Sequence, residues 1–280
     1  MMSKKFLKFN LLAMMMAFTF QLLAQEGIPS GWKLGSQAYT FRLFSLEETL
    51  EKLNSIGVKH VELYPGQKIS KGGEATSHFS ASSSDKATIK RLLEKFDIEP
   101  VAYGVASPSD EEWPQLFAFA KEMGIGILTT EPRPNQFDMI EKLCEEHQIK
   151  IALHNHPVPS MYWHPTVPLR LLEGRSELMG VCADIGHWVR SGLDPVESLK
   201  MLEGRVISLH MKDLNVAGIR NAHDIPWGTG NCNVAGVLHE LNRQGFEGVF
   251  SAEYEHNWEN NLPEVKESMD YFKRVASQFQ

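Results

Sequence analysis

The sequence predicts a (β/α)8 barrel, or TIM barrel, and three observations support this fold class. Strand-like apolar runs alternate eight times with segments of helical periodicity, an order that favours a parallel sheet covered by helices. Barrels of this type have about 250 residues, which residues 25–280 match. No linker or low-complexity tract interrupts the alternation, so we predict a single domain over residues 25–280.

The first 24 residues are predicted to lie outside the barrel, as a signal peptide. Three lysines precede the apolar run 11–20, and Ala24 offers a small residue for cleavage, the pattern of an export signal. Gln21 ends the apolar run before it reaches the ~20 residues that a membrane-spanning helix needs. We therefore expect export across the inner membrane to the periplasm, with no membrane contact after cleavage.

The composition excludes several classes of function. The formal net charge is -7 and no basic cluster is present, which argues against a nucleic-acid partner. The three cysteines are far apart in the sequence, so they predict neither a disulfide framework nor a zinc-finger motif. The expected partner is a small molecule, and self-association into a homo-oligomer stays open.

The predicted strands and helices follow one another closely. The strands are expected at residues 33–41, 58–64, 100–105, 125–130, 149–154, 179–184, 206–212 and 248–255. The helices are expected at residues 46–56, 85–97, 111–123, 136–148, 168–173, 194–202, 233–244 and 262–275. Ser45 and Glu48 form a capping box at the start of the first helix.

Four successive predicted strands end in residues of the types that bind metals. In a barrel the active site lies at the carboxyl ends of the strands, and every second side chain of a strand points inward. The interior rim is therefore expected to collect a set of polar side chains, namely Glu62, Glu131, His154, His156, Asp184, His210, Lys212 and Glu253. One buried histidine alone would be read as a satisfied core residue, but four strands ending alike favour a site.

Imidazole and carboxylate groups together favour a transition metal. Such a mixed set suits Zn, Mn, Co, Fe or Ni rather than a cation that prefers oxygen ligands alone. The pattern does not distinguish among these metals. A divalent metal ion is thus the predicted cofactor.

At this point the sequence resembles the xylose isomerase-like TIM barrels, which include sugar isomerases, sugar epimerases and AP-endonuclease-type barrels. The resemblance rests on Asp184 in Ala-Asp-Ile-Gly-His, His210 in Leu-His-Met-Lys-Asp and Glu253 in Ala-Glu-Tyr-Glu. It implies a divalent metal held by Glu, Asp, His and Glu at the ends of strands five to eight. It also implies that His187 contacts the substrate or a further metal.

Strand five departs from the family pattern. It carries His154 in Leu-His-Asn-His where the family usually has glutamate. An imidazole reaches about as far as a glutamate carboxylate, so we predict His154 as the fourth ligand, with Glu131 on the neighbouring strand as a ligand or base beside it. The predicted metal ligands are Glu131, His154, Asp184, His210 and Glu253.

The resemblance implies an isomerase or epimerase that abstracts a proton α to the carbonyl of a keto sugar. Family isomerases use glutamates on strands five and eight as bases, and only Glu253 is present here, so the second base would be Glu131, His154 or His156. The predicted catalytic residues are Glu131, His156 and Glu253. Two alternatives stay open: a lyase or hydratase acting on oxidised sugars such as 3-keto-glycosides, and a carbohydrate-binding barrel without activity. A DNA-repair nuclease is excluded by acidity, export and too few histidines.

Further rim residues are predicted to contact the substrate. Aromatic rings near the rim, Tyr162, Trp163 and Trp188, would stack on a sugar or else anchor loops. The segment Gly228–Gly230 could cradle a phosphate, although two glycines are a weak signal. The predicted substrate-binding residues are Tyr39, Glu62, Trp163, His187, Lys212 and His223.

Overall fold

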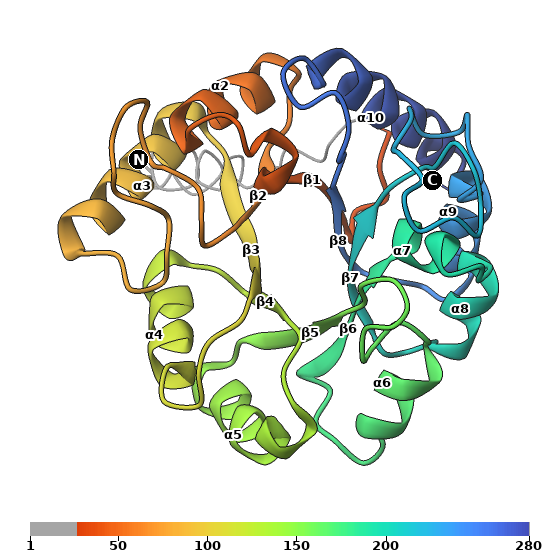
Figure 1. Ribbon diagram of the computed structural model, residues 1–280, viewed down its shortest axis with the longest axis horizontal. Helices are drawn as coiled ribbons and strands as arrows, with labels where there is room; N and C mark the ends of the chain where they lie inside the picture. The colour runs from red at the N-terminus through yellow and green to blue at the C-terminus, as the bar shows by residue number, and fades with distance from the viewer. Residues whose placement is uncertain (1–26, 280) are drawn as a thin grey trace, which may run out of the picture.

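Eight parallel strands close into a barrel, as predicted (Figure 1). The computed structural model describes residues 27–279, so the predicted signal peptide lies outside the described residues. Each strand pairs with the next, and β1 pairs with β8 to close the barrel. The strands are β1 (Trp32–Gln37), β2 (His60–Leu63), β3 (Glu99–Ala106), β4 (Ile127–Thr130), β5 (Lys150–His154), β6 (Met179–Asp184), β7 (Val206–Met211) and β8 (Gly248–Ala252).

The helices form a ring around the outside of the barrel (Figure 1). They are α2 (Leu46–Ser55), α3 (Ser83–Phe96), α4 (Trp113–Met123), α5 (Phe137–His147), α6 (Thr166–Leu171), α7 (Ile185–Arg190), α8 (Pro195–Met201), α9 (Val234–Arg243) and α10 (Leu262–Ala276). Among the described residues, no helix is both long enough and apolar enough to cross a membrane.

The helices form where their apolar residues share a face and their first turns are capped. Helix α2 shows this plainly, because Ser45 and Glu48 make the predicted capping box. Leu46, Leu50 and Leu53, spaced along one face, are all buried against the barrel. The local sequence and the tertiary packing of α2 thus agree.

The buried apolar side chains form two separate clusters. The larger layer lies between the barrel and its helices. A smaller cluster of buried side chains from β3 to β8, which includes Ala152, Cys182 and Val249, forms a second layer of its own. Cys182 is therefore the buried small residue expected from its place in mid-strand. Ala152 and Cys182 each lie two residues before a candidate ligand, so the polar groups gather beyond this layer at the carboxyl ends.

The structure ends the first and last strands earlier than predicted. After Gln37 the chain turns into a 3-10 helix, η1 (Ala38–Phe41), because the Gln37 side chain accepts a hydrogen bond from the backbone N–H of Tyr39. The same side chain donates to the carbonyl of Gly104 at 2.6 Å. Tyr39 therefore extends from a turn, and Glu253 directly follows β8.

Helix α7 was not predicted. It begins directly at the end of β6, where the Asp184 carboxylate accepts the backbone N–H of His187 at 2.7 Å. Aspartate is a favoured residue at this capping position. His187 is therefore placed by a helix that follows the strand without a loop.

The loop after β7 is built around the Asp213 carboxylate. This side chain is buried and accepts backbone N–H groups from Gly228 and Gly230 at 2.8 and 2.9 Å, and from Leu214 and Cys232 at 3.0 and 2.8 Å. The glycine amides that were considered for a phosphate are thus already occupied. The phosphate interpretation of this segment is wrong, because the protein supplies its own anion there.

Replacing Asp213 with alanine should destabilise the protein strongly. Four backbone N–H groups would lose their acceptor, and an unsatisfied buried donor costs ~1–3 kcal/mol. We expect the free energy of unfolding in urea to fall by about 3–5 kcal/mol, near the upper end for single substitutions. Thr229→Ala, which removes one exposed hydroxyl of the same loop, should change it by less than about 0.5 kcal/mol. Equal effects of the two variants would contradict this account.

Candidate functional site

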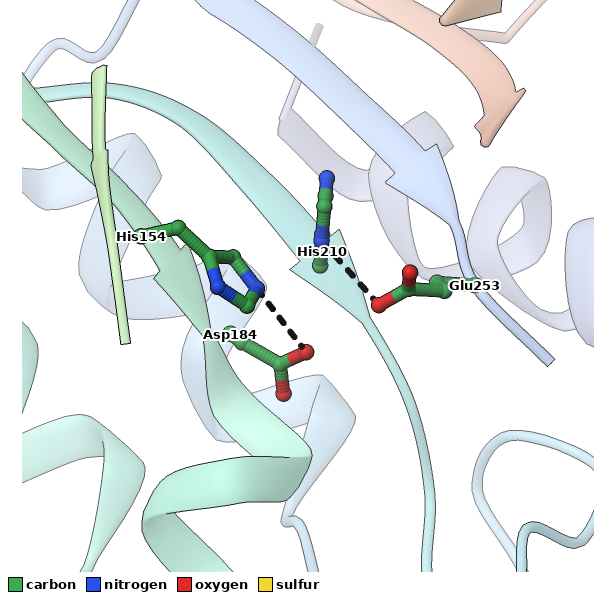
Figure 2. A group of neighbouring side chains, drawn as sticks. All are labelled: His154, Asp184, His210 and Glu253. Carbon is green, nitrogen blue, oxygen red and sulfur yellow. Dashed lines mark ion pairs between the residues drawn. The ribbon is translucent and has the colours of Figure 1, made fainter. Parts of the chain in front are cut away.

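Four buried side chains meet at the carboxyl ends of β5 to β8: His154, Asp184, His210 and Glu253. Their ligand-type atoms all lie within 4.8 Å of one another. Figure 2 shows His154 facing Asp184 and His210 facing Glu253, with an Nε2–Oδ2 distance of 3.7 Å and an Nδ1–Oε2 distance of 3.1 Å. Two ligands ~2.1 Å from a tetrahedral ion lie roughly 3.4 Å apart, so the spacing suits a metal ion.

Each imidazole of this cluster has one nitrogen held by a carboxylate. His154 Nδ1 lies 2.9 Å from Glu131 Oε1, and His210 Nε2 lies 3.0 Å from Glu62 Oε2. The other nitrogens, His154 Nε2 and His210 Nδ1, are buried and make no well-formed hydrogen bond among the described residues. Metal-binding histidines typically show this arrangement, in which a carboxylate holds the nitrogen remote from the metal. The four residues therefore fit a divalent cation.

Glu62 supports His210 and does not reach a cavity. Its side chain is fully buried, and its oxygens also accept hydrogen bonds from Thr129 and Ser251, each at 2.7 Å. The prediction that Glu62 contacts the substrate is therefore corrected. The sequence placed it on the inner face of β2 but could not show that β7 supplies its partner.

Lys212 lies inside the ligand cluster. Its ammonium group is 2.8 Å from Asp184 Oδ2 and 3.1 Å from Glu255 Oε1, and it also contacts Glu253. A Cβ atom on Gly186 would lie 2.6 Å from Lys212 Cδ, so only glycine leaves room for this side chain. Because Lys212 is fully buried among carboxylates, its position does not match the predicted role in substrate binding.

The charges of the cluster stabilise one another. Burial alone would raise the pKa of Asp184 and of Glu253, but the Lys212 ammonium group holds the pKa of Asp184 well below its usual range. Lys212 and His210 do the same for the pKa of Glu253. The carboxylates in turn outweigh burial and keep the pKa of Lys212 well above its usual value. The carboxylates therefore stay ionised at neutral pH.

Two cavities flank the cluster. One, of about 360 Å³, includes Tyr39, Tyr64, His154 and Glu253 in its lining. The other, of about 370 Å³, includes Arg190, Arg220 and His223. His156, His187 and Glu255 line both. A larger hollow of about 1120 Å³ is lined by residues around the first residues of β2 and β3, away from these groups, so we place the candidate site at the two smaller cavities.

The structure brings most of the predicted site residues together. Glu131 lies beside His154 and accepts hydrogen bonds from it and from His156, so it forms a second group of possible metal ligands with these two histidines. Tyr39, His187 and His223 line the cavities, as expected for substrate contact. Their roles stay predictions.

Of the aromatic residues near the rim, only Trp163 was predicted outright to bind substrate, and that prediction is corrected. Trp163 lines neither cavity. Tyr162 is buried and donates to the carbonyl of Pro132, so it anchors a loop, the alternative left open for it. Trp188 is buried within α7.

Four charged or aromatic residues that line the cavities were not among the predicted site residues: Tyr64, Arg190, Arg220 and Glu255. Glu255 follows Glu253 by two residues, and this alternation was a usable signal. Arg190 follows His187 by three residues, a spacing that brings two side chains together only in a helix, and no helix was predicted there. Tyr64 directly follows β2, at the carboxyl end where a barrel site is expected.

Comparison with known families identifies the family of this chain. A family model described as a xylose isomerase-like TIM barrel matches residues 50–275. The chain belongs to this family. The match confirms the resemblance predicted from the strand ends. Membership indicates a sugar-modifying enzyme with a small carbohydrate substrate.

Similar solved structures agree with the fold. An uncharacterised protein from Parabacteroides distasonis ATCC 8503 is 37% identical, with a TM-score of 0.71, over 87% of this chain and 99% of the other. A D-tagatose 3-epimerase-like protein is 19% identical, with a TM-score of 0.71, over 88% and 98%. The probable 3-DHS dehydratase AsbF from Bacillus anthracis is 17% identical, with a TM-score of 0.64, over 86% and 98%. A comparison with curated proteins found no match.

The metal-free protein should lose stability as the pH rises above neutrality. Burial lowers the pKa of His154, but the nearby carboxylates of Asp184 and Glu131 outweigh it and raise the pKa from 6.5 to about 9. A raised pKa contributes stability that is complete below pH ~6.5 and lost as the pH rises through ~9. We expect a contribution of at most about 3 kcal/mol, measured by urea unfolding in a chelator between pH 6 and 9.5.

His154→Gln should flatten this pH dependence. His164→Gln, a change at a partly exposed histidine whose ring is hydrogen-bonded to Thr166, should leave it unchanged. Parallel pH profiles for His154→Gln and the wild type would show that the His154 pKa is not raised by folding.

Proposed function

We propose that this protein is a metal-dependent enzyme that abstracts a proton α to the carbonyl of a keto sugar or sugar derivative, in an isomerisation or epimerisation. The observation that carries the proposal is the pair of buried nitrogens, His154 Nε2 and His210 Nδ1, which face carboxylates without well-formed hydrogen bonds. A buried polar atom without a partner costs free energy, and a metal ion would remove that cost.

The proposed metal ligands are His154, Asp184, His210 and Glu253. A bound divalent metal would supply Lewis-acid polarisation of substrate oxygens and would neutralise developing negative charge. Glu131 and Glu62 orient the two imidazoles from behind. Lys212 balances the remaining charge of the carboxylates.

His156 is the proposed base on one side of the substrate. Its Nδ1 is bonded to Glu131, so its Nε2 is the basic nitrogen available, and the side chain lines both cavities. Burial opposes ionisation of Glu131, but its hydrogen bonds to His154 and His156 lower its pKa to about 2. Because Glu131 Oε1 accepts from both imidazoles, this carboxylate orients His156 in the proposed reaction.

Glu253 is the proposed base on the other side. It follows β8 directly, lines the smaller cavity and lies within the ligand cluster. Two different groups, an imidazole and a carboxylate, would thus face the substrate. Epimerisation needs one group to remove the proton and another to return it on the opposite face.

A lyase or hydratase acting on an oxidised sugar is the second candidate. The specific observation is the imidazole pair at the strand-five end, His154 and His156, where family members usually have a carboxylate. After the same proton abstraction, an imidazolium could protonate a leaving oxygen. The fold similarity to a probable 3-DHS dehydratase is compatible with this reaction.

Export to the periplasm is also a proposal. It rests on the lysines, the apolar run and Ala24 in the first 24 residues. Cell fractionation of the full-length chain, with mass spectrometry of its N-terminus, tests it, and an intact Met1 in a cytoplasmic product would contradict it.

Replacing Asp184 with alanine should abolish metal binding. The change removes one of four ligands and leaves Lys212 paired with Glu253 and Glu255. We expect metal content, measured by elemental analysis of purified protein, to fall from about one ion per chain to background. Asp270→Ala, at a half-exposed site on α10, is the control. Retention of stoichiometric metal by Asp184→Ala would show that the site is assigned wrongly.

Replacing His156 with glutamine should slow proton exchange at the substrate's α carbon by about 10²–10⁴-fold. The measurement is deuterium incorporation from D₂O by proton NMR, with metal-loaded protein and a panel of keto sugars and 3-keto-glycosides. An isomer conserves mass, whereas elimination releases water or an aglycone, so the product separates the two candidates. His164→Gln is the matched control.

Two results of the same exchange experiment would contradict the proposal. Binding without exchange or turnover by the wild type would favour a carbohydrate-binding barrel. Full exchange in His156→Gln would assign the base elsewhere, to Glu253 or Glu255.

A further inference from the structure

His187 lies at the boundary between the two cavities and beside the ligand cluster. It lines both cavities, and its Nε2 is 3.6 Å from Asp184 Oδ2. Its ring stacks on that of His156, with centroids 5.1 Å apart. A substrate bound beside Asp184 would therefore meet the Nε2 edge of this ring. Whether that edge carries a proton decides what His187 can do.

The other nitrogen of His187 is occupied by a guanidinium group. Arg190 Nη1 lies 3.0 Å from His187 Nδ1. A guanidinium has only donors and stays protonated in proteins, so Nδ1 must be the acceptor in this hydrogen bond. A neutral imidazole that accepts at Nδ1 carries its proton on Nε2. The hydrogen bond thus selects one tautomer of His187.

Arg190 is itself held firmly in place. Its Nε and Nη2 donate to the carbonyl of Ala222 at 3.3 and 3.2 Å, and its Nη2 also donates to Asp224 Oδ2 at 3.1 Å. The side chain is only 8% exposed. The loop after β7 therefore fixes the guanidinium, and the guanidinium fixes the imidazole one turn away on α7. None of these contacts involves the ligand cluster.

We infer that Arg190 is a positioning residue that holds His187 as a neutral imidazole with its N–H at Nε2, directed at an oxygen atom of the substrate. In this state His187 has no free lone pair, so it is neither a base nor a metal ligand. It acts as a hydrogen-bond donor to a carbonyl or hydroxyl oxygen next to the reacting carbon. The contact with substrate rests on the proposed function, whereas the tautomer does not.

The tautomer can be measured without substrate. In metal-free protein labelled with ¹⁵N-histidine, long-range ¹H–¹⁵N spectra distinguish protonated from unprotonated ring nitrogens for each of the 11 histidines, and His187→Gln assigns the His187 signals. We expect an unprotonated Nδ1 and a protonated Nε2. A wild-type spectrum with the proton of His187 on Nδ1 overturns the inference, whatever any variant does.

Variants test the role of Arg190. Arg190→Met should move the His187 Nδ1 signal toward that of a protonated nitrogen, and Arg190→Lys, which keeps a donor, should retain most of the wild-type signal. Arg220→Met is the matched control, because Arg220 lines the same cavity but bonds to the carbonyls of Pro157 and Val158. An unchanged His187 signal in Arg190→Met, with circular dichroism showing a folded protein, also overturns the inference.

Addition of a keto sugar that the wild type binds, with D-fructose as the first probe, tests the contact with substrate. The Nε2–H signal of His187 should shift on binding, and Arg190→Met should bind the same sugar about tenfold more weakly, the equivalent of ~1.4 kcal/mol. Binding without any shift at His187 would overturn the contact. If the wild type neither binds nor turns over keto sugars, the proposed function fails, while the ligand-free spectra still decide the role of Arg190.

Discussion

The site depends on a balance of buried charge. Three carboxylates, those of Asp184, Glu253 and Glu255, surround one ammonium group, that of Lys212. Buried charges without partners cost several kcal/mol each, so neither sign could be gathered here alone. Because the ammonium lies beside them, the buried carboxylates of Asp184 and Glu253 can remain ionised. Gly186 is part of this balance, because a side chain at that position would clash with the side chain of Lys212.

A second set of carboxylates holds the candidate histidine ligands from other strands of the barrel. Glu62 extends from β2 to His210 on β7, and Glu131 follows β4 and holds His154 on β5. Side chains that lie far apart in the sequence therefore set the orientation of the candidate ligands. Such support from behind is as characteristic of a metal site as the ligands themselves. The barrel interior is thus a connected network and not a set of separate strand ends.

Periodicity predicted the alternating strands and helices, including the bounds of β6, because burial on both faces leaves a strong local pattern. The pattern failed where hydrogen bonding and not hydropathy ends an element, as at Gln37. Helix α7 is only six residues long and starts directly from a strand, too short for a periodic signal. The partners of Glu62 and Arg190 depend on distances across the barrel and between loops, which no local pattern contains.

The Asp213 carboxylate has a consequence for the energetics of association. It organises the loop after β7 from within, and that loop supplies Arg220, Ala222 and His223 to one cavity wall. Ordering a flexible loop around a ligand consumes part of the free energy of contact. Here that ordering belongs to folding, so the wall stands before any ligand arrives. A ligand as small as a single sugar makes few contacts with the protein. Because none of the free energy of these contacts is used to order the loop, most of it can appear as binding affinity.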